Sequence, residues 1–343
     1  MKKVGFYGGK FLPLHQGHVY AIIKASTMVE ELFVVLSHSE KRDQELCEGS
    51  ELPYIPSRIR LRWLSQLTKE MTNVKVIEVE DHDGNEDYNW KEGSIKIKEA
   101  IGKNIDVVFS SEKGYDPIFQ ELYPEATHVL IDEKREQVPI SATEIRKKGV
   151  FHYWHYIPKV TKPYFVKKVV ILGTESCGKS TLTRNLALIY NTTYVSEYGR
   201  DICEELGGCD GIMIDEDYPL IAYGHKLKEY EASKQANKIV FIDTEAAVTQ
   251  FYSELYNQKT QQVLNEIAKN QQYDLCLFLE PDVKWVDDGL RVHGEQQVRE
   301  ENNQRLKELL NEYKIPFVSI SGTYQERFEK AIDLIRGRLG VSN

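Results

Sequence analysis

The chain has 343 residues, of which 41% are hydrophobic and 28% are charged, and its formal net charge is −9. This length suffices for two domains with separate cores, and the composition excludes a disordered or fibrous protein. The negative charge argues against bulk nucleic-acid binding, which needs clustered Lys and Arg, so no nucleic-acid partner is expected. No membrane span is expected either, because no stretch approaches the roughly 18 apolar residues that one requires.

Cysteine usage points to a reducing compartment. The five cysteines are scattered, odd in number and form no C-x-x-C pair, which predicts neither a disulfide framework nor a zinc site. The N-terminus has too short an apolar run for a signal peptide. We therefore expect a cytoplasmic protein. The cysteines are Cys47, Cys177, Cys203, Cys209 and Cys276.

Two segments look like the start of an α/β domain, residues 3–9 and 168–173. Each is an apolar run followed by a glycine-bearing turn and a helical pattern. Helical patterns (for example 57–69 and 223–236) separate the later strand candidates, and this alternation predicts two parallel-sheet α/β domains. The later strand candidates are residues 32–36, 74–79, 107–110, 128–131, 238–243, 275–280 and 316–320.

A connector joins the two halves at residues 151–163. It contains two prolines and a dense aromatic cluster, which favour a packed segment over a loose tether. The predicted domains are residues 1–162 and 163–343.

The first phosphate-site candidate follows the opening strand. Glycines at a strand end let backbone approach a ligand, and the helix N-terminus after them attracts phosphate. His15 and His18 stand three residues apart across this turn, so both imidazoles can face one anion. For His-x-Gly-His alone, a plain strand–helix turn with two exposed histidines is an equal alternative.

The full string Gly-x-Phe-x-Pro-x-His-x-Gly-His resembles the nucleotidyltransferase superfamily. The resemblance implies that His15 and His18 bind the triphosphate of ATP and stabilise charge on its α-phosphate. Residues 140–146 look like the family's Ile-Ser-x-Thr-x-Ile-Arg, which holds the β- and γ-phosphates. Ser141 and Glu144 also match a capping box, and both roles are compatible. The implied ATP-binding residues are Gly8, Gly9, Lys10, Phe11, His15, His18, Ser141, Thr143 and Arg146.

The string Ser110-Ser111-Glu112 and residues 81–90 look similar to enzymes that adenylylate nicotinamide mononucleotide. Trp90 can stack on a cationic nicotinamide ring, since an indole face attracts cations. A core position is the alternative for Trp90. Asp81 and Trp90 are the expected mononucleotide-binding residues.

The second phosphate-site candidate is a P-loop, Gly-x-x-x-x-Gly-Lys-Ser, with a strand before it and a helix after it. Its backbone N–H groups would cradle phosphate, Lys179 would reach the β- and γ-phosphates, and Ser180 would ligate Mg²⁺. Cys177 is read as a small filler and not as a nucleophile. The expected ATP-binding residues are Gly173, Glu175, Ser176, Cys177, Gly178, Lys179, Ser180 and Thr181.

Three further segments of the second half could contribute to the P-loop site. Asp243 ends a predicted strand, where it can hold Mg²⁺ or accept a substrate hydroxyl proton, or can cap the next helix. Residues 197–201 look like an acceptor-site loop. Residues 285–291 look like a lid in which Arg291 closes on transferring phosphate, and a solvated surface arginine is the alternative.

The order of these motifs along the whole chain is similar to the NadR family, which pairs nicotinamide mononucleotide adenylyltransferase with ribosylnicotinamide kinase. The resemblance implies ATP, nicotinamide riboside, nicotinamide mononucleotide and NAD as ligands, with Mg²⁺ at Ser180 and Asp243. It implies catalytic roles for His15, His18 and Lys179, with Asp243 or Glu197 as hydroxyl acceptor. The implied riboside-binding residues are Glu197, Tyr198, Arg200, Asp201, Asp243 and Trp285.

Some members of that family also carry an N-terminal helix-turn-helix and act as repressors. Here the first strand already begins at Lys3, so a repressor role is not expected. Two alternatives stay open: a coupled kinase–nucleotidyltransferase of flavin or coenzyme A synthesis, and a nucleotide-sensing regulator. A homo-oligomer is also left open.

Overall fold

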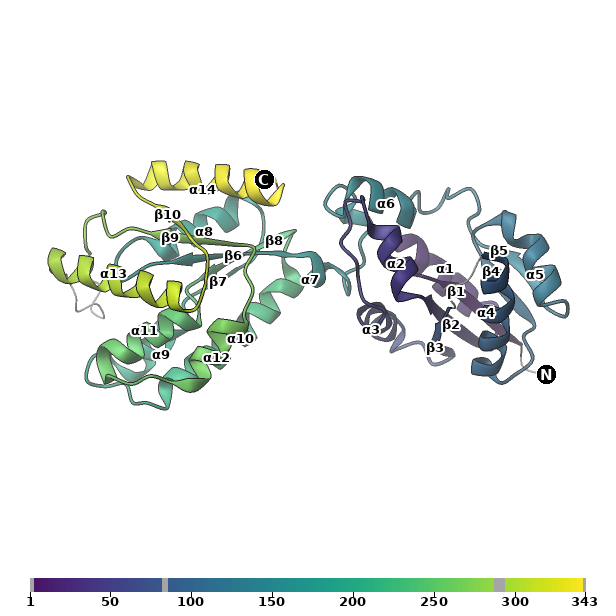
Figure 1. Ribbon diagram of the computed structural model, residues 1–343, viewed down its shortest axis with the longest axis horizontal. Helices are drawn as coiled ribbons and strands as arrows, with labels where there is room; N and C mark the ends of the chain where they lie inside the picture. Colours follow the sequence, from purple (N-terminus) through teal and green to yellow (C-terminus); the bar gives the residue numbers. More distant parts are fainter. Residues whose placement is uncertain (1–2, 82–85, 287–293, 342–343) are drawn as a thin grey trace. The chain divides into compact units, whose positions relative to one another are not determined.

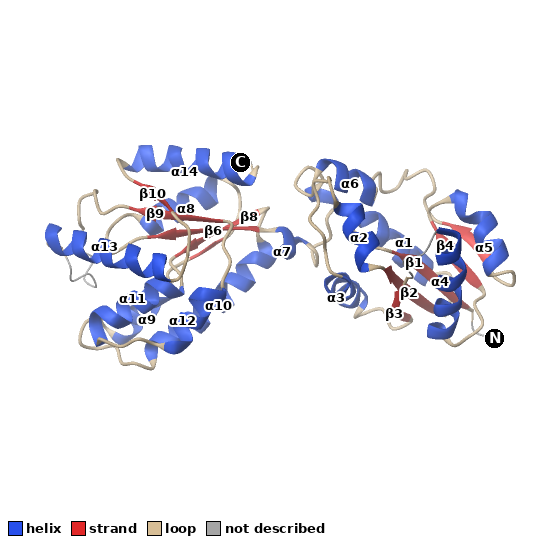
Figure 2. Cartoon of the chain, viewed as in Figure 1, coloured by secondary structure: helices blue, strands red, loops and turns tan. Residues whose placement is uncertain are grey.

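The computed structural model describes residues 3–81, 86–286 and 294–341. Contacts along the chain divide it into two compact units, Met1–Lys162 and Pro163–Asn343. Figure 1 shows a sheet with surrounding helices in each unit, and Figure 2 marks these elements by type. No helix among the described residues is long and apolar enough to cross a membrane.

The first unit contains a five-stranded, all-parallel sheet in the order β3-β2-β1-β4-β5. Connections from β1 run outward in one direction through β2 and β3, and the chain then crosses to β4 and β5. The switch point therefore lies between β1 and β4, where open α/β sheets bind their ligands. The strands are β1 (Val4–Gly9), β2 (Glu31–His38), β3 (Val74–Glu80), β4 (Val107–Ser110) and β5 (Thr127–Leu130).

Right-handed crossovers place the helices of this unit on both faces of the sheet. One core cluster joins the strands to the region of α4 and α5 and includes Phe6, Val35 and Phe119. The helices are α1 (Gln16–Ser26), α2 (Glu40–Cys47), α3 (Ser57–Thr68), α4 (Glu86–Ile101), α5 (Asp116–Leu122) and α6 (Ala142–Lys148), with short 3-10 turns η1 (Lys113–Tyr115) and η2 (Trp154–Tyr156).

The connector packs at its start, as its aromatic content predicts. Trp154 is buried, and its ring lies 5.8 Å from that of Phe151. The Lys162 ammonium lies 5.1 Å from the Trp154 ring, within cation–π range.

The second unit contains another five-stranded parallel sheet, in the order β10-β9-β6-β8-β7. Strand β6 is central and pairs with β8 on one side, with Ile171 opposite Asp243. This register places the P-loop after β6 next to the end of β8. The strands are β6 (Lys167–Leu172), β7 (Tyr194–Val195), β8 (Ile239–Asp243), β9 (Leu275–Leu279) and β10 (Val318–Ile320).

Helices cover both faces of this second sheet, with α8 and α14 on one side and α10 and α11 on the other (Figure 1). The buried strands β8 and β9 have no exposed residue, which is typical of a parallel sheet covered on both faces. The helices are α7 (Lys162–Phe165), α8 (Lys179–Ile189), α9 (Tyr198–Leu206), α10 (Asp217–Gln235), α11 (Ala246–Asn257), α12 (Gln262–Asn270), α13 (Gln296–Glu312) and α14 (Tyr324–Leu339).

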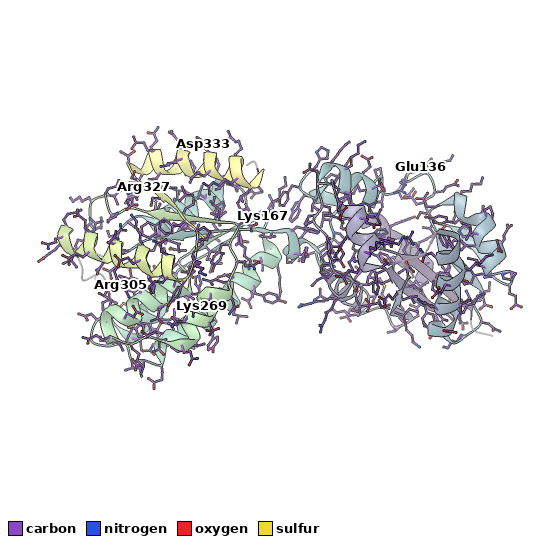
Figure 3. All side chains as sticks on the ribbon, viewed as in Figure 1. Glu136, Lys167, Lys269, Arg305, Arg327 and Asp333 are labelled. Carbon is purple, nitrogen blue, oxygen red and sulfur yellow. A yellow bond between two sulfur atoms is a disulfide. The ribbon has the colours of Figure 1, made fainter. Side chains whose placement is uncertain are left out.

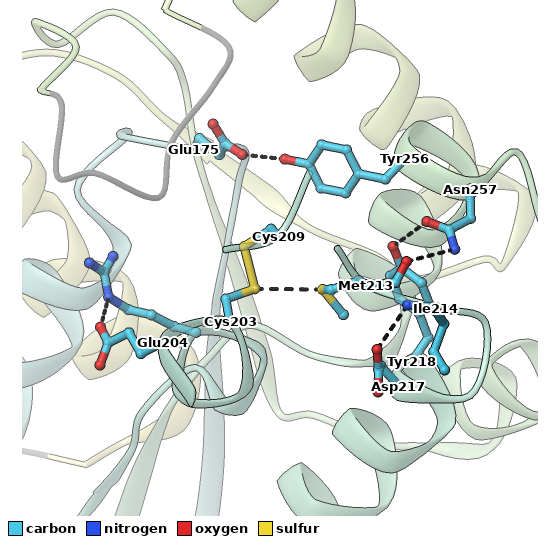
Figure 4. The surroundings of a disulfide bond; sticks show 11 residues. Glu175, Cys203, Glu204, Cys209, Met213, Ile214, Asp217, Tyr218, Tyr256 and Asn257 are labelled. Atoms are coloured by element: carbon cyan, nitrogen blue, oxygen red, sulfur yellow. Dashed lines mark hydrogen bonds and ion pairs between the residues drawn. A yellow bond between two sulfur atoms is a disulfide. The ribbon is translucent and has the colours of Figure 1, made fainter. Parts of the chain in front are cut away.

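The predicted α/β class with two parallel sheets is confirmed, and each strand candidate corresponds to a strand with ends shifted by at most two residues. The two-residue strand β7 was not predicted, because so short an edge strand has no readable periodicity. The cysteine pattern predicted no disulfide framework, and the structure contains one disulfide among its described residues. Helix α9 ends at Gly207 in the left-handed conformation, and the returning chain brings Cys209 to a disulfide with Cys203 (Figure 4).

Candidate functional sites

The histidine motif forms the N-terminus of α1 directly after β1. His15 caps the helix, because its Nδ1 accepts from the Gly17 N–H at 3.1 Å. The backbone N–H of His15 in turn donates to Nδ1 of His18 at 3.3 Å. The two rings stack with centroids 3.7 Å apart. Since both Nδ1 atoms accept hydrogen bonds, the neutral rings carry their protons on Nε2, where they can donate to a ligand.

Both histidines are neutral at physiological pH. Burial and the positive charge of Arg135 lower the pKa of His18 to about 3. Burial, His18 and Arg135 together hold the pKa of His15 well below its usual range. The rings therefore act as hydrogen-bond donors, and full positive charge must come from other residues.

A cavity of about 240 Å³ lies over this motif at the switch point. The ends of β1 and β4 form part of its wall, together with the residues that follow β5 and the start of α6. Of the predicted ATP-binding residues, five line it: Gly8, His15, His18, Ser141 and Thr143.

Other predicted residues of this site are not among those that line the cavity. Arg146 donates to the Leu12 carbonyl at 2.7 Å and to the Thr143 hydroxyl at 3.0 Å, so it braces the two motifs against each other. Lys10 is paired with the buried carboxylate of Asp43 at 2.7 Å. Phe11 is buried, with its ring 5.0 Å from that of His18. Gly9, the last residue of β1, does not line the cavity either.

The expected capping box at α6 forms only in part. The Ser141 hydroxyl accepts from the Glu144 N–H at 3.1 Å and so caps the helix. The Glu144 carboxylate instead accepts from the Tyr153 hydroxyl at 3.2 Å. The Glu144 carboxylate is therefore engaged by Tyr153 of the connector, and not by the backbone N–H of Ser141 as in a capping box.

The two mononucleotide-binding candidates lie outside this cavity's lining. Trp90 packs beside the core cluster, with its ring 5.2 Å from Tyr115 and 6.0 Å from Phe119. Tyr115 itself lines the cavity. Asp81 accepts from the Ser37 hydroxyl at 2.6 Å. The assignment of Trp90 and Asp81 to the mononucleotide stays a prediction.

Arg135 is a residue of this site that motif reading missed. It lines the cavity, donates to the Ile140 carbonyl at 2.7 Å and pairs with Glu112 at 2.7 Å. It adopts a left-handed conformation, with φ of 53°. No short motif marks it, and only the folded loop brings its charge near the two histidines.

The P-loop of the second unit runs from the end of β6 into α8. Gly173 has φ of 141°, and a Cβ there would lie 2.7 Å from the Cys177 sulfur and 2.8 Å from the Leu279 carbonyl. Only glycine fits such a position. Cys177 is buried and its sulfur lies 3.0 Å from the Thr174 carbonyl. Burial raises the pKa of this thiol, which agrees with a structural filler.

Two carboxylates, Glu197 and Asp243, lie near enough to Lys179 of the P-loop to interact with its charge. Burial, followed by the negative charge of Glu197, raises the pKa of Asp243 to about 6, while Lys179 and the Ser180 hydroxyl oppose this shift. Burial alone would lower the pKa of Lys179, but Cys177, Glu197 and Asp243 raise it overall.

Asp243 is held by a strained turn. The next residue, Thr244, has φ of 74°, which is unusual for a β-branched side chain. The Thr244 hydroxyl contacts the Asp243 carboxylate at 3.3 Å, and its carbonyl lies 3.1 Å from Nε2 of His225. Helix α11 is capped by Glu245, so the alternative of Asp243 as its cap is wrong.

A cavity of about 150 Å³ opens beside the P-loop. Residues 175–181 form one wall, and the predicted acceptor-site residues Glu197, Tyr198 and Arg200 form another. Gly173, Asp201 and Asp243 are not among the residues that line it, and Asp201 is paired with Lys228 at 2.6 Å. Figure 4 shows Cys203, Cys209 and Tyr256 in this region, with the Tyr256 hydroxyl donating to Glu175.

The predicted lid is described only at its start. Trp285 does not line the described cavity, and its ring packs against Gly294. The neighbouring Val286 N–H donates to the Ser176 hydroxyl at 2.9 Å, so this segment reaches the P-loop. Arg291 lies outside the described residues.

Comparison with known proteins agrees with both halves of the fold. A cytidylyltransferase-like family model matches residues 6–148, and an AAA domain model matches residues 168–327. Fold and sites together define a two-unit nucleotide enzyme that joins a nucleotidyltransferase to a P-loop kinase-like unit. The chain belongs to the NadR family: it is 38% identical over 349 residues to the trifunctional NAD biosynthesis/regulator protein NadR of Escherichia coli K12, across 99% of this chain and 84% of that protein.

Solved structures of the same family extend the likeness to three dimensions. A NadR protein in complex with NR matches with a TM-score of 0.81 and 26% identity, over 100% of this chain and 97% of that one. A NadR protein in complex with NAD and AMP-PNP matches with a TM-score of 0.81 and 25% identity, over 100% and 98%.

Proposed function

We propose that the two units catalyse consecutive steps of NAD salvage. Residues 163–343 transfer the γ-phosphoryl group of ATP to the 5′-hydroxyl of nicotinamide riboside. Residues 1–162 then join the resulting mononucleotide to the adenylyl group of a second ATP, which forms NAD and releases pyrophosphate. One observation carries this proposal: a single NadR-family chain contains two cavities, each lined by a predicted phosphate-binding motif. One cavity lies over the histidine motif and the other beside the P-loop.

In the adenylyltransferase unit, catalysis comes from positioning and charge neutralisation. The mononucleotide phosphate attacks the α-phosphorus directly, so no covalent enzyme intermediate is needed. The Nε2–H groups of His15 and His18 donate to the oxygens on which charge builds, and Arg135 supplies the positive charge that the neutral rings lack. Ser141 and Thr143 offer hydroxyls to the other end of the triphosphate.

In the kinase unit, Lys179 and the backbone of the P-loop bind the β- and γ-phosphates. Glu197 lines the cavity, whereas Asp243 does not and is buried beside Ser180. This difference supports Glu197 as the acceptor of the riboside hydroxyl proton and Asp243 as a metal-site carboxylate. Tyr198 and Arg200 line the same cavity, which supports their proposed role in binding the riboside.

Ser180 and Asp243 fit a hard divalent cation such as Mg²⁺. The Asp243 side chain is almost fully buried. One of its carboxylate oxygens, Oδ2, nevertheless has no hydrogen-bond partner among the described residues. Such an orphaned carboxylate oxygen is suited to the water shell of Mg²⁺. The cation would neutralise phosphate charge during phosphoryl transfer. A cytoplasmic location stays a prediction.

The test is incubation of the purified chain with nicotinamide riboside, ATP and Mg²⁺, with the mononucleotide, NAD, ADP and pyrophosphate measured together. The proposal requires all four products, and NAD must also form from added mononucleotide without riboside. Flavin and coenzyme A precursors serve as competing acceptors. Turnover of one of those in place of the riboside would refute the assignment.

A further inference from the structure

A Ser–His–Asp hydrogen-bond chain lies behind the cavity of the first unit. The Ser110 hydroxyl, at the end of β4, lies 2.7 Å from Nε2 of His128 on β5. Nδ1 of His128 contacts the carboxylate of Asp116 at the start of α5. The His128 ring also packs edge-on against Phe119, with centroids 4.9 Å apart. Ser110 lines the cavity, so this hydrogen-bond chain reaches the site from the end of β4, within the same lining as the histidine motif.

His128 joins a carboxylate on one side to a hydroxyl on the other. A carboxylate only accepts, so Nδ1 of His128 donates to Asp116, and Nε2 is hydrogen-bonded to the Ser110 hydroxyl. The Ser110 oxygen accepts from the Glu112 N–H at 3.2 Å and lies 3.3 Å from the Glu112 carbonyl. The serine thereby clamps the backbone of the turn after β4.

This turn carries the carboxylate that holds Arg135. Glu112 accepts from Nη2 of Arg135 at 2.7 Å, while Nη1 donates to the Ile140 carbonyl beside Ser141. The Glu112 and Arg135 side chains are 53% and 36% exposed. An ion pair this exposed contributes only about 0–1 kcal/mol by itself. The pair therefore depends on a backbone that is held in place from elsewhere.

We propose that Asp116, His128 and Ser110 form a positioning relay for adenylyl transfer, which fixes Glu112 and through it aims Arg135 at the triphosphate. This inference rests on the proposed function of the first unit. It assigns the three residues as positioning groups and not as a nucleophilic triad. The Ser110 hydroxyl is almost buried and is engaged by both His128 and the Glu112 N–H, so it is a holding group.

The test is a double-mutant cycle in the full chain, measured as adenylyl transfer from ATP to the mononucleotide. Ser110→Ala is expected to lower kcat about tenfold with KM for ATP changed less than about threefold. In an Arg135→Ala background the same substitution is expected to cost less than about twofold, because its route of action is gone. Equal losses in both backgrounds would overturn the relay.

Substitutions at His128 give a second, independent arm. His128→Gln keeps an acceptor near the position of Nε2 and is expected to retain activity within about threefold, whereas His128→Phe should match Ser110→Ala. If Gln and Phe lose activity equally, the hydrogen bond is not the active feature and the proposal fails. Labelling of Ser110 by a fluorophosphonate would also overturn it, since that result would make the serine a nucleophile.

Controls separate this inference from folding and from the proposed function. Ser94→Ala removes a buried hydroxyl of the same unit whose hydrogen bond, within the part of the chain that the structure describes, runs to the Lys91 carbonyl of its own helix, and should leave activity unchanged. Kinase activity of each variant reports the integrity of the second unit. If the unsubstituted chain forms no NAD, both proposals fall. If it forms NAD and Ser110→Ala behaves like Ser94→Ala, only the relay falls.

Discussion

The guanidinium of Arg327 donates a 2.6 Å hydrogen bond to the carbonyl of Cys177, inside the P-loop. Arg327 belongs to α14, some 150 residues further along the chain, and Figure 3 labels it at that helix. It is buried and also donates to the carbonyls of Glu280 and Gly322. Arg327 of α14 therefore links the P-loop by hydrogen bonds to the residue after β9, Glu280, and to Gly322, which precedes α14.

Replacing Arg327 should weaken the kinase without touching the adenylyltransferase. Arg327→Met leaves three carbonyl oxygens without their donor, and hydrogen bonds to a charged group contribute about 1.5–3 kcal/mol each. We expect riboside phosphorylation to fall at least tenfold and the second unit to unfold at lower temperature. Arg338→Met, on the exposed end of the same helix, is the matched control. Unchanged kinase kinetics in Arg327→Met would show that the loop holds its shape unaided.

Lys179→Ala removes the side-chain cation of the P-loop. Phosphorylation of the riboside should fall by roughly a hundredfold or more, because charge on the transferring phosphoryl group loses its neutralising partner. NAD formation from added mononucleotide should stay nearly constant. Kinase activity within tenfold of the unsubstituted chain would be incompatible with the P-loop assignment.

His18→Ala is the reciprocal change in the first unit. It deletes one of the two Nε2–H donors that we propose to contact the α-phosphate, and adenylyl transfer should lose about 3 kcal/mol of transition-state stabilisation, as at other oxyanion sites. Steady-state rates of both activities decide the outcome. A parallel loss of kinase activity would instead indicate a folding defect.

The kinase should lose activity on the acid side at a higher pH than a normal aspartate would dictate. Burial and Glu197 raise the pKa of Asp243 to about 6, and only the ionised carboxylate can serve the metal site. At limiting Mg²⁺, Asp243 takes up a proton in place of the cation as pH falls through 6, and kcat/KM for the riboside should decline. The Asp243→Asn variant should be nearly inactive at every pH. A flat profile down to pH 5 would argue against a role for this carboxylate.

The two activities should separate when the chain is divided. Each unit has its own sheet and its own cavity, so a fragment ending at Pro163 should adenylylate the mononucleotide and one starting at Tyr164 should phosphorylate the riboside. Circular dichroism establishes whether each fragment is folded. Folded but inactive fragments, beside an active intact chain, would mean that the units share a site.

The sequence by itself determined the class of fold, both phosphate-binding motifs and the family, because these depend on local patterns. An apolar run indicates a buried strand whichever strands it pairs with. The spacing of glycine and lysine in a P-loop is fixed by a single backbone turn. The NadR resemblance and the bifunctional NAD salvage function inferred from it were confirmed by a relative that matches 99% of the chain.

Only the tertiary structure decided which charges surround those motifs. Arg135 and Arg327 reach their sites through contacts with residues far along the chain or on irregular loops, where no period or spacing marks them. The same holds for the Ser110–His128 bond between neighbouring strands and for the disulfide of Cys203 with Cys209. Such contacts depend on where the folded chain returns in space, and a local pattern of residues carries no record of that return.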